Sequence, residues 1–490
     1  MKQGLLRALA CFAALLALAV PTAWGAAALK PCRIAGIRHE VQCGVVARPL
    51  NPARPEGVKI DVHYVVVPAM ARRKWPDPVF LLAGGPGQSA IDVAGGVLPL
   101  FARLNNRRDI VFVDQRGTGR SAPLECEDER DLPLAQRADP ELQLARLTRC
   151  RDTLQKMPHG DLRMFTTPIA MQDLDAVRAQ LGAARINLVG VSYGTRAALD
   201  YQRQFPQHVR RSVLDGVAPP DMALPQSYAT DGQAAFDAQL AACEAEVACA
   251  RAHPRLRADW AALLAALPRS VTLAHPLTGE PERFTLTREM VLGAVRGPLY
   301  TPAAASALPF AIAAAARGRY EPLAGLAGLL GTRRGSALAA GLHFSVMCAE
   351  DYPRMAHDGG DTASDIGAEF ARLYQRACAQ WPRGAVPAAF YELAASDTPA
   401  LLLSGGLDPV TPPRHGARVA QALGANAVHV VVDNAGHGVL GLGCMADVMF
   451  RFIDAAEPAQ ALAVDAACAQ RIPRPSAYQP RVLPTTGRAP

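Results

Sequence analysis

The chain has 490 residues, of which 50% are hydrophobic and 19% charged, and its formal net charge is +7. This composition is that of an ordinary globular protein with enough apolar residues for a large core. Arginine greatly outnumbers lysine, but no dense basic run with interleaved aromatic residues occurs. We therefore expect a solvated basic surface and no nucleic-acid partner.

The N-terminus has the pattern of a secretory signal peptide. Lys2 and Arg7 give a basic start, and the apolar residues 8–20 that follow are too few to span a bilayer. Small residues then lead to a predicted cleavage near Gly25, and an uncleaved anchor is the alternative. No later apolar run reaches about 18 residues, so we expect no transmembrane segment in the mature protein.

The first predicted strands lie within residues 31–70, and the next, residues 79–83, runs into the cluster G-G-P-G. Glycines let the backbone approach a developing oxyanion closely, so Gly84 and Gly85 are candidate oxyanion-hole donors. A tight turn without a ligand is the alternative. A phosphate-binding P-loop is disfavoured, because no Gly-Lys-Ser/Thr follows.

A further predicted strand, residues 110–113, ends at Asp114 and Arg116. Both residues have the chemistry of catalytic groups. We expect them to form structural ion pairs instead, because an acid for the catalytic site is found elsewhere in the chain.

Residues 190–194 read G-V-S-Y-G and lie between an apolar run and a helix-forming run. A strand, a tight turn and a helix with G-x-S-x-G form the nucleophile elbow of an α/β-hydrolase, which raises the serine hydroxyl above the sheet. Ser192 is therefore the candidate nucleophile. The backbone amide of Tyr193 is the second candidate oxyanion donor, because it follows the nucleophile.

Two later apolar strands each end in a polar residue: an L-L-L run with a glycine turn precedes Asp408, and a V-V-V run precedes His437. The order Ser, Asp, His is that of α/β-hydrolase triads, and open α/β sheets carry their sites just past the strands. His437 would take the proton of Ser192, and Asp408 would orient the imidazole. Asp433 is the alternative acid, to which we assign a structural turn.

Between these core strands, alanine and leucine dominate at helical spacing, as in residues 236–242 and 260–267. The chain is also longer than a minimal α/β-hydrolase. We therefore predict an α/β-hydrolase fold, with a mostly parallel central sheet and an inserted, mainly helical cap. The predicted boundaries are 1–25 for the signal peptide, 26–221 and 396–471 for the core, 222–395 for the cap and 472–490 for a loose tail.

The chain has eleven cysteines, and all except Cys11 can be grouped into pairs that follow one another along the sequence. This pattern predicts disulfides formed in an oxidising compartment, with sequential pairing as a hypothesis and reduced buried cysteines as the alternative. We predict no metal site, because no C-x-x-C with a second ligand pair is present. Cys11 also raises the alternative of a lipoprotein, which its flanking residues fit poorly. The neighbours are Cys32 with Cys43, Cys126 with Cys150, Cys243 with Cys249, Cys348 with Cys378, and Cys444 with Cys468.

The chain resembles the prolyl aminopeptidases and their secreted tripeptidyl-aminopeptidase relatives from about Pro31 to Pro473. The small prolyl aminopeptidases usually have histidine where this chain has Ala83, which favours the larger secreted branch. The segments that carry the resemblance are G-G-P-G at 84–87, D-Q-R-G-T-G-R-S at 114–121, T-T at 166–167, D-L-D-A-V-R at 173–178, G-V-S-Y-G-T at 190–195 and L-D-G-V-A-P-P at 214–220.

The resemblance implies a serine aminopeptidase in which acidic cap residues bind the α-ammonium group of a short peptide. Glu350 and Asp351 follow an apolar run and a cysteine within the predicted cap. A desolvated carboxylate is a natural partner of an ammonium group. We predict Glu350, with Asp351 as an option, as the amine anchor; a helix-end or surface acid pair is the alternative.

The sequence thus predicts an exported, periplasmic or secreted serine aminopeptidase that acts through an acyl-enzyme and needs no metal or organic cofactor. An esterase or lipase with the same triad is the main alternative, because fold and triad do not fix the substrate. A silent binding protein is disfavoured by the intact triad, and an epoxide hydrolase or dehalogenase by the serine nucleophile. The number of residues released and the oligomeric state stay open.

Overall fold

The computed structural model describes residues 29–328, 338–355, 366 and 368–480. The predicted signal peptide, residues 1–25, lies outside the described residues, as do residues 481–490 of the predicted tail. Within the described ranges, no helix combines the length and the apolar character that crossing a bilayer requires.

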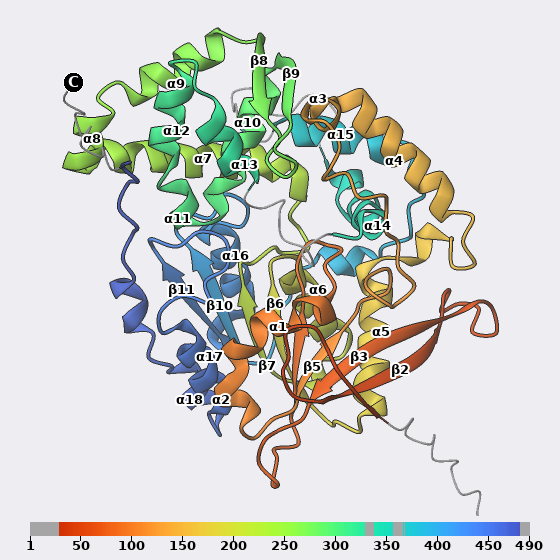
Figure 1. Cartoon of the computed structure of the whole chain (residues 1–490). Helices are drawn as coiled ribbons and strands as arrows, with labels where there is room; N and C mark the ends of the chain where they lie inside the picture. The colour runs from red at the N-terminus through yellow and green to blue at the C-terminus, as the bar shows by residue number, and fades with distance from the viewer. Residues whose placement is uncertain (1–28, 329–337, 356–365, 367, 481–490) are drawn as a thin grey trace, which may run out of the picture.

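A nine-stranded sheet with the order β1-β2-β3-β5-β4-β6-β7-β10-β11 forms the centre of the molecule (Figure 1). The strands from β5 to β11 in this order run parallel to their neighbours, and β1, β2 and β3 extend one edge in antiparallel fashion. The mostly parallel sheet that the sequence predicts is confirmed. The strands are β1 (Lys30–Cys32), β2 (Val41–Pro49), β3 (Lys59–Val67), β4 (Val79–Leu82), β5 (Ile110–Val113), β6 (Ile186–Val191), β7 (Val209–Asp215), β10 (Ala400–Gly405) and β11 (Ala427–Val432).

Helices cover both faces of this sheet, because its central strands are apolar on both sides. In β4, Val79 and Leu81 pack under α1 and α17, whereas Phe80 and Leu82 pack on the opposite face under α5 and α6. The core helices are α1 (Ala90–Val97), α2 (Ala102–Asn105), α5 (Thr167–Gln180), α6 (Tyr193–Gln204), α16 (Pro413–Leu423), α17 (Met445–Asp454) and α18 (Pro458–Leu462).

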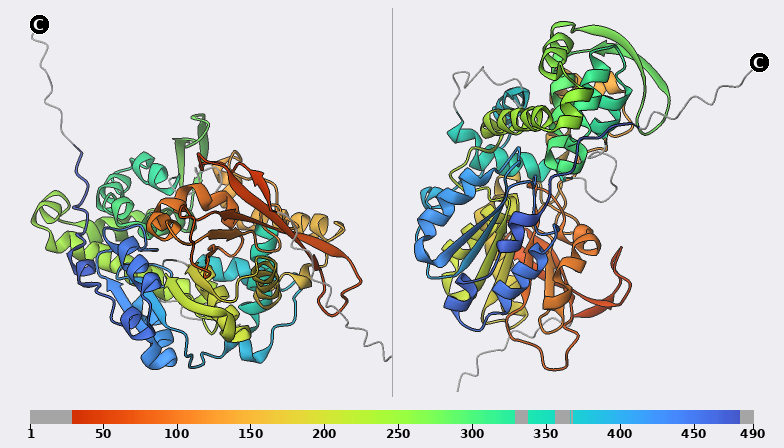
Figure 2. Two further views of the ribbon diagram at one scale, coloured as in Figure 1. Left: turned by 90° about the horizontal axis from the view of Figure 1, so that it is seen from below. Right: turned by 90° about the vertical axis from the view of Figure 1, so that its left-hand side faces the viewer.

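Between β7 and β10 the chain leaves the sheet and forms a mainly helical layer, which we call the cap (Figures 1 and 2). The cap has an apolar core of its own, in which Phe236, Trp260 and Ile312 are buried. Its helices are α7 (Leu224–Ala245), α8 (Val247–Ala252), α9 (Leu256–Ala265), α10 (Arg288–Arg296), α11 (Pro302–Ala305), α12 (Leu308–Ala315), α13 (Glu321–Gly328), α14 (Ala340–Glu350) and α15 (Ala368–Cys378).

The cap also holds an antiparallel hairpin of β8 (Arg269–Ala274) and β9 (Pro281–Leu286), which the sequence analysis did not predict. The sequence does contain a strand pattern here, but it is short. In β8, Val271 and Leu273 are buried and alternate with exposed residues, which is the pattern of a strand with one face on a core. The alanine- and leucine-rich helices on either side obscured it.

Two segments outside the predicted cap boundaries contact the cap. Helices α3 (Leu134–Ala138) and α4 (Pro140–Leu154) lie beside it: the Leu134 amide donates to Glu282 at 2.7 Å. The described part of the predicted tail, residues 472–480, runs along the cap, where the Tyr478 amide donates to the Ser306 carbonyl at 2.9 Å (Figure 2). Backbone pairing of this kind leaves no periodic pattern in the sequence.

Five disulfides confirm the sequential pairing of the cysteines, and they are compatible with export. Each closes a short stretch of chain, so each constrains one local region rather than tying distant domains together. One of them joins the cap helices α14 and α15. The pairs are Cys32–Cys43, Cys126–Cys150, Cys243–Cys249, Cys348–Cys378 and Cys444–Cys468.

Candidate active site

Ser192 lies in the tight turn between β6 and α6, with a backbone φ of +56° that a non-glycine residue rarely adopts. The flanking glycines make this turn possible. A Cβ at Gly194 would collide with the carbonyl oxygen of Leu82, and one at Gly190 with the backbone of Gly194 itself. The strain of such a conformation is typical of a functional position, and it presents the serine at the carboxyl end of β6.

Asp408 and His437 form a direct pair, with Asp408 Oδ2 and His437 Nδ1 2.8 Å apart. The carboxylate is buried and held from its other side. Its Oδ1 accepts the amides of Val410 at 2.8 Å and Thr411 at 2.9 Å, and the Thr411 hydroxyl donates to Oδ2 at 2.7 Å. Since Nδ1 donates to the carboxylate, Nε2 of His437 is the nitrogen available to accept a proton.

The electrostatics of the pair favour an ionised acid and a basic imidazole. Burial alone would raise the pKa of Asp408, but the nearby His437 and the bonds from Thr411 outweigh it, and the pKa of Asp408 is lowered. Burial alone would lower the pKa of His437, but the Asp408 carboxylate, with help from Asp215, raises it. These shifts are those expected where an acid steadies the charge of a general base.

The carboxyl end of β7 lies between the nucleophile and the base. The Ser192 amide donates to the carbonyl of Asp215 at 2.8 Å, and a Cβ on the next residue, Gly216, would lie 3.2 Å from Cε1 of His437. The Asp215 carboxylate accepts the amide of Val439 at 2.9 Å, and burial raises the pKa of Asp215 to about 6. The structure thus places Ser192, Asp408 and His437 after the carboxyl ends of β6, β10 and β11, at the same edge of the sheet.

The G-G-P-G loop after β4 borders the nucleophile: a Cβ at Gly84 would lie 3.3 Å from the Cβ of Ser192. The Gly84 amide donates to Gln88 Oε1 at 3.3 Å, which leaves the Gly85 amide as the better candidate of the two for an oxyanion. A side chain at residue 84 would therefore crowd Ser192 and the Val191 carbonyl oxygen.

Tyr193, whose amide is the other candidate donor, is anchored by its side chain. Its hydroxyl lies 2.6 Å from Thr167 Oγ1 and accepts a hydrogen bond from Gln115 Nε2 at 3.0 Å. Because the ring is buried and its hydroxyl is held, the first residue of α6 has a fixed position beside Ser192.

The two acids predicted to bind an amine lie at the end of α14 and are completely enclosed. Glu350 Oε1 accepts the Thr167 amide at 2.7 Å, and both Asp351 oxygens face the Arg196 guanidinium at 3.0 and 3.1 Å. Burial raises the pKa of Glu350 to about 8. The structure therefore connects both acids to core helices α5 and α6, and amine recognition by either stays a prediction.

Three other polar residues from the sequence analysis lie away from this arrangement. Asp433 is exposed. Arg116 does form a buried ion pair, with Asp173 at 2.6 Å. Asp114 does not take part in that pair; it accepts the Ser89 hydroxyl at 2.7 Å at the start of α1.

A tyrosine and an arginine of the cap lie beside His437, and the sequence analysis did not identify them. The Tyr300 ring meets the His437 ring edge-on at 5.3 Å, and its carbonyl accepts the His437 amide at 2.8 Å. Arg296 Nη2 donates to the Tyr300 hydroxyl at 3.2 Å, and its charge opposes protonation of His437. No motif marks these residues, because only the folded cap brings them to the core. Among the described residues, no three His, Cys, Asp or Glu side chains gather as a metal site would need.

Two family models match the chain in the regions that carry these residues. The model described as "alpha/beta hydrolase fold" matches residues 77–265, and the model described as "TAP-like protein" matches residues 363–468. The first span includes Ser192, and the second includes Asp408 and His437. The chain has the α/β-hydrolase fold.

Parts of the chain are similar in sequence to two peptidases, and nearly all of it to a carboxylesterase. It is 34% identical to "Tripeptidyl aminopeptidase" of Streptomyces lividans over 197 residues, which are 37% of this chain and 36% of that protein. It is 31% identical to "Serine protease Hip1" of Mycobacterium tuberculosis over 241 residues, 45% of each chain. "Carboxylesterase B" of the same species is 27% identical over 481 residues, 86% of each. The matched part of the chain thus spans less than half the length of the first two relatives.

Proposed function

We propose that this protein is an exported serine aminopeptidase that hydrolyses short peptides from a free N-terminus. The observation that carries the proposal is the 2.8 Å contact between Asp408 and His437 at the same sheet edge as the Ser192 turn. The two peptidase relatives support a peptide substrate, and the five disulfides support export.

In the proposed reaction, Ser192 Oγ attacks the scissile carbonyl while Nε2 of His437 takes its proton. The amides of Gly85 and Tyr193 donate to the oxyanion that forms; losing one such donor typically costs about 10²–10³ in turnover. His437 then gives its proton to the leaving amine as the C–N bond breaks. Water attacks the acyl-enzyme with His437 as base, which releases the N-terminal fragment and restores Ser192.

The proposal includes a carboxylate that binds the substrate's ammonium group, and Glu350, with Asp351 as an option, is the proposed anchor. Asp351 already has Arg196 as a full counter-charge, whereas Glu350 Oε2 is 3.7 Å from that guanidinium. An ammonium group that reached Glu350 would favour its ionised form and lower the raised pKa of this carboxyl.

A carboxylesterase is the second candidate, because the relative of that name matches 86% of the chain. The same serine, histidine and aspartate would then act on an ester, and no ammonium anchor would be needed. The two candidates differ in one measurable property, which is the dependence of cleavage on a free N-terminus.

The test uses purified mature protein with Ser192→Ala as the control. Anilides of Ala-Ala-Pro, Ala-Ala-Ala and single Pro, each with a free and an acetylated N-terminus, are compared with a short-chain nitrophenyl ester. We expect cleavage of the free peptides that requires Ser192 and is lost on acetylation, and the preferred length gives the number of residues released. Ester hydrolysis without amide cleavage favours the esterase, and indifference to acetylation rules out an ammonium anchor.

A further inference from the structure

The start of cap helix α14 packs directly on the G-G-P-G loop. The Ala339 amide donates to the Gly87 carbonyl at 2.9 Å, and a Cβ at Gly87 would lie 2.9 Å from the Ala339 carbonyl oxygen. Two backbones in such close contact leave no room for a side chain or for movement of one without the other. The conformation of the loop therefore depends on where α14 lies.

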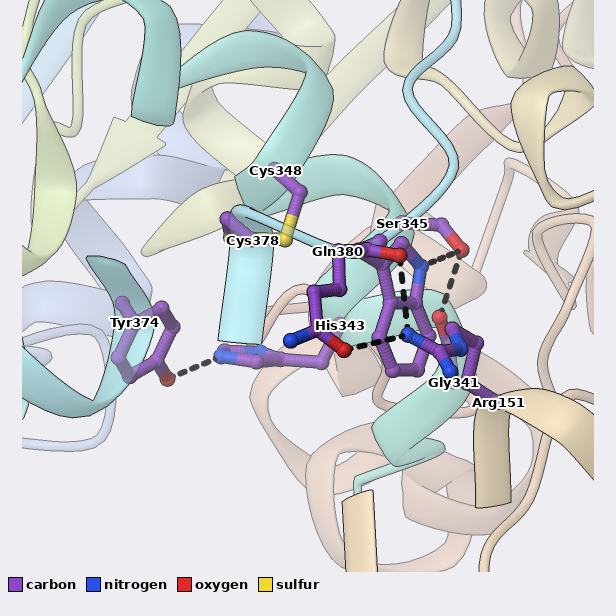
Figure 3. Close-up of a disulfide and its surroundings, with 9 residues drawn as sticks. Arg151, Gly341, His343, Ser345, Cys348, Tyr374, Cys378 and Gln380 are labelled. Atoms are coloured by element: carbon purple, nitrogen blue, oxygen red, sulfur yellow. Dashed lines mark hydrogen bonds between the residues drawn. A yellow bond between two sulfur atoms is a disulfide. The ribbon is translucent and has the colours of Figure 1, made fainter. Parts of the chain in front are cut away.

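One side chain of α14, His343, makes a polar contact with the same loop. Its Nδ1 lies 2.9 Å from the Pro86 carbonyl oxygen, and its Nε2 lies within hydrogen-bond distance of the Tyr374 hydroxyl (Figure 3). A carbonyl oxygen only accepts, so Nδ1 carries the hydrogen and Nε2 of the neutral ring accepts from Tyr374. Burial lowers the pKa of His343, which keeps the ring in this neutral form.

The orientation of His343 is fixed by the pairing of α14 with α15. The Cys348–Cys378 disulfide joins the two helices one turn beyond the histidine and its tyrosine (Figure 3). Phe344 adds a ring contact of 5.0 Å with Tyr374. The Tyr374 hydroxyl at Nε2 thus orients the His343 ring so that Nδ1 donates to the carbonyl oxygen of Pro86.

We propose that His343 is a positioning residue for the oxyanion hole, which fixes the turn that presents the Gly85 amide by bonding to the carbonyl of Pro86. This inference rests on the proposed function, because it takes the G-G-P-G loop as an oxyanion donor. A G-G-P-G loop that adopts several conformations would stabilise the tetrahedral intermediate less, while substrate binding would be unchanged. His343 therefore acts on kcat rather than on KM, and equally on peptide and ester substrates.

Two isosteres separate this role from packing. His343→Asn places an amide N–H where Nδ1 lies, whereas His343→Gln places one where Nε2 lies. We expect His343→Asn to keep kcat within about threefold and His343→Gln to lose about tenfold, with KM nearly unchanged in both. Ser345→Ala is the matched control. Ser345 lies on the same helix as His343, and its hydroxyl accepts a buried hydrogen bond from Trp381 Nε1 at 3.1 Å. The alanine variant removes this bond without touching the loop, so its kcat should equal that of the wild type.

Equal kcat values for the asparagine and glutamine variants, or a loss expressed in KM, would overturn the inference. If neither variant folds, Tyr374→Phe is the test, because it removes the hydroxyl that orients the imidazole of His343. A fall in kcat of a few fold would support the positioning role. A kcat equal to that of the wild type would overturn it. The wild type and Ser192→Ala are assayed in the same series. A wild type without Ser192-dependent turnover would refute the proposed function itself, which is a different result from unchanged kcat in the His343 variants.

Discussion

Two buried carboxylates of this protein lie in similar surroundings and have different partners. Asp408 and Asp351 are both almost fully enclosed, and each bonds to a basic side chain at about the same distance. The partner of Asp408 is His437, a part-exposed imidazole at the sheet edge that carries Ser192. The partner of Asp351 is Arg196, whose side chain is 0% exposed.

The difference shows how one type of contact serves two purposes. An imidazole can gain and lose a proton near neutral pH, so a carboxylate beside it tunes a reaction. A guanidinium does not lose its proton in a protein, so a carboxylate beside it makes a permanent ion pair. Arg196 belongs to core helix α6 and Asp351 follows cap helix α14, so this second pair connects cap and core.

The largest effect that separates the two pairs is expected in catalysis. Asp408→Asn should leave the fold intact and lower kcat by about 10⁴, because the amide no longer stabilises the imidazolium or fixes its tautomer. Loss of the carboxylate also removes what raises the pKa of His437, so the acid limb of the pH–rate profile should move to lower pH. Steady-state kinetics between pH 5 and pH 9 measure both effects.

Asp433→Asn is the matched control for this change. Asp433 lies four residues before His437 and is exposed, so its amide variant should keep the wild-type kcat. A large loss of kcat in Asp433→Asn, with little effect in Asp408→Asn, would instead assign Asp433 as the acid of the triad.

The residues of the proposed triad could be predicted from the sequence because each of them follows its own apolar strand. A buried parallel strand is a short continuous run of branched apolar residues, and the loop after it is where polar groups gather. Contacts across the cap–core boundary have no such local signal. Glu350 and Asp351 stood out as acids, but nothing near them in the sequence indicates Thr167 or Arg196 as partners.

The second effect is expected in stability. Asp351→Asn leaves the Arg196 charge buried with a neutral partner, and breaking a buried ion pair in this way typically costs about 3–5 kcal/mol of unfolding free energy. Denaturant unfolding followed by circular dichroism measures the loss. The exposed pair of Glu141 and Arg376 gives a control, since Glu141→Gln should leave the unfolding midpoint unchanged.

A stability of Asp351→Asn equal to that of the wild type would mean that the pair does not connect cap to core. A marked fall in kcat with normal stability would instead place Asp351 in substrate binding, as the sequence analysis allowed. The two readouts therefore separate the structural role of this acid from its predicted role as an amine anchor.

The smallest effect concerns Glu350, the buried acid that precedes Asp351 at the end of α14. Its pKa in the folded protein is raised to about 8 from the ordinary value of 4.5 by burial. Between these two values the folded chain keeps a proton that the unfolded chain has released, so this group makes stability fall as pH rises through that window. Below the window both states are protonated, and the contribution is constant.

The glutamine side chain of Glu350→Gln cannot ionise. The variant therefore lacks the pH dependence of stability that the uptake of about one proton by Glu350 causes. Relative to the wild type, the variant should gain stability steadily from about pH 5 to pH 8, and unfolding curves at four pH values measure the trend. Asp215, whose pKa is raised to about 6, has the same sign but is present in both proteins and cancels in the comparison. A stability difference between variant and wild type that stays constant from pH 5 to pH 8 would mean that Glu350 is ionised in the fold and pairs with Arg196, as Asp351 does.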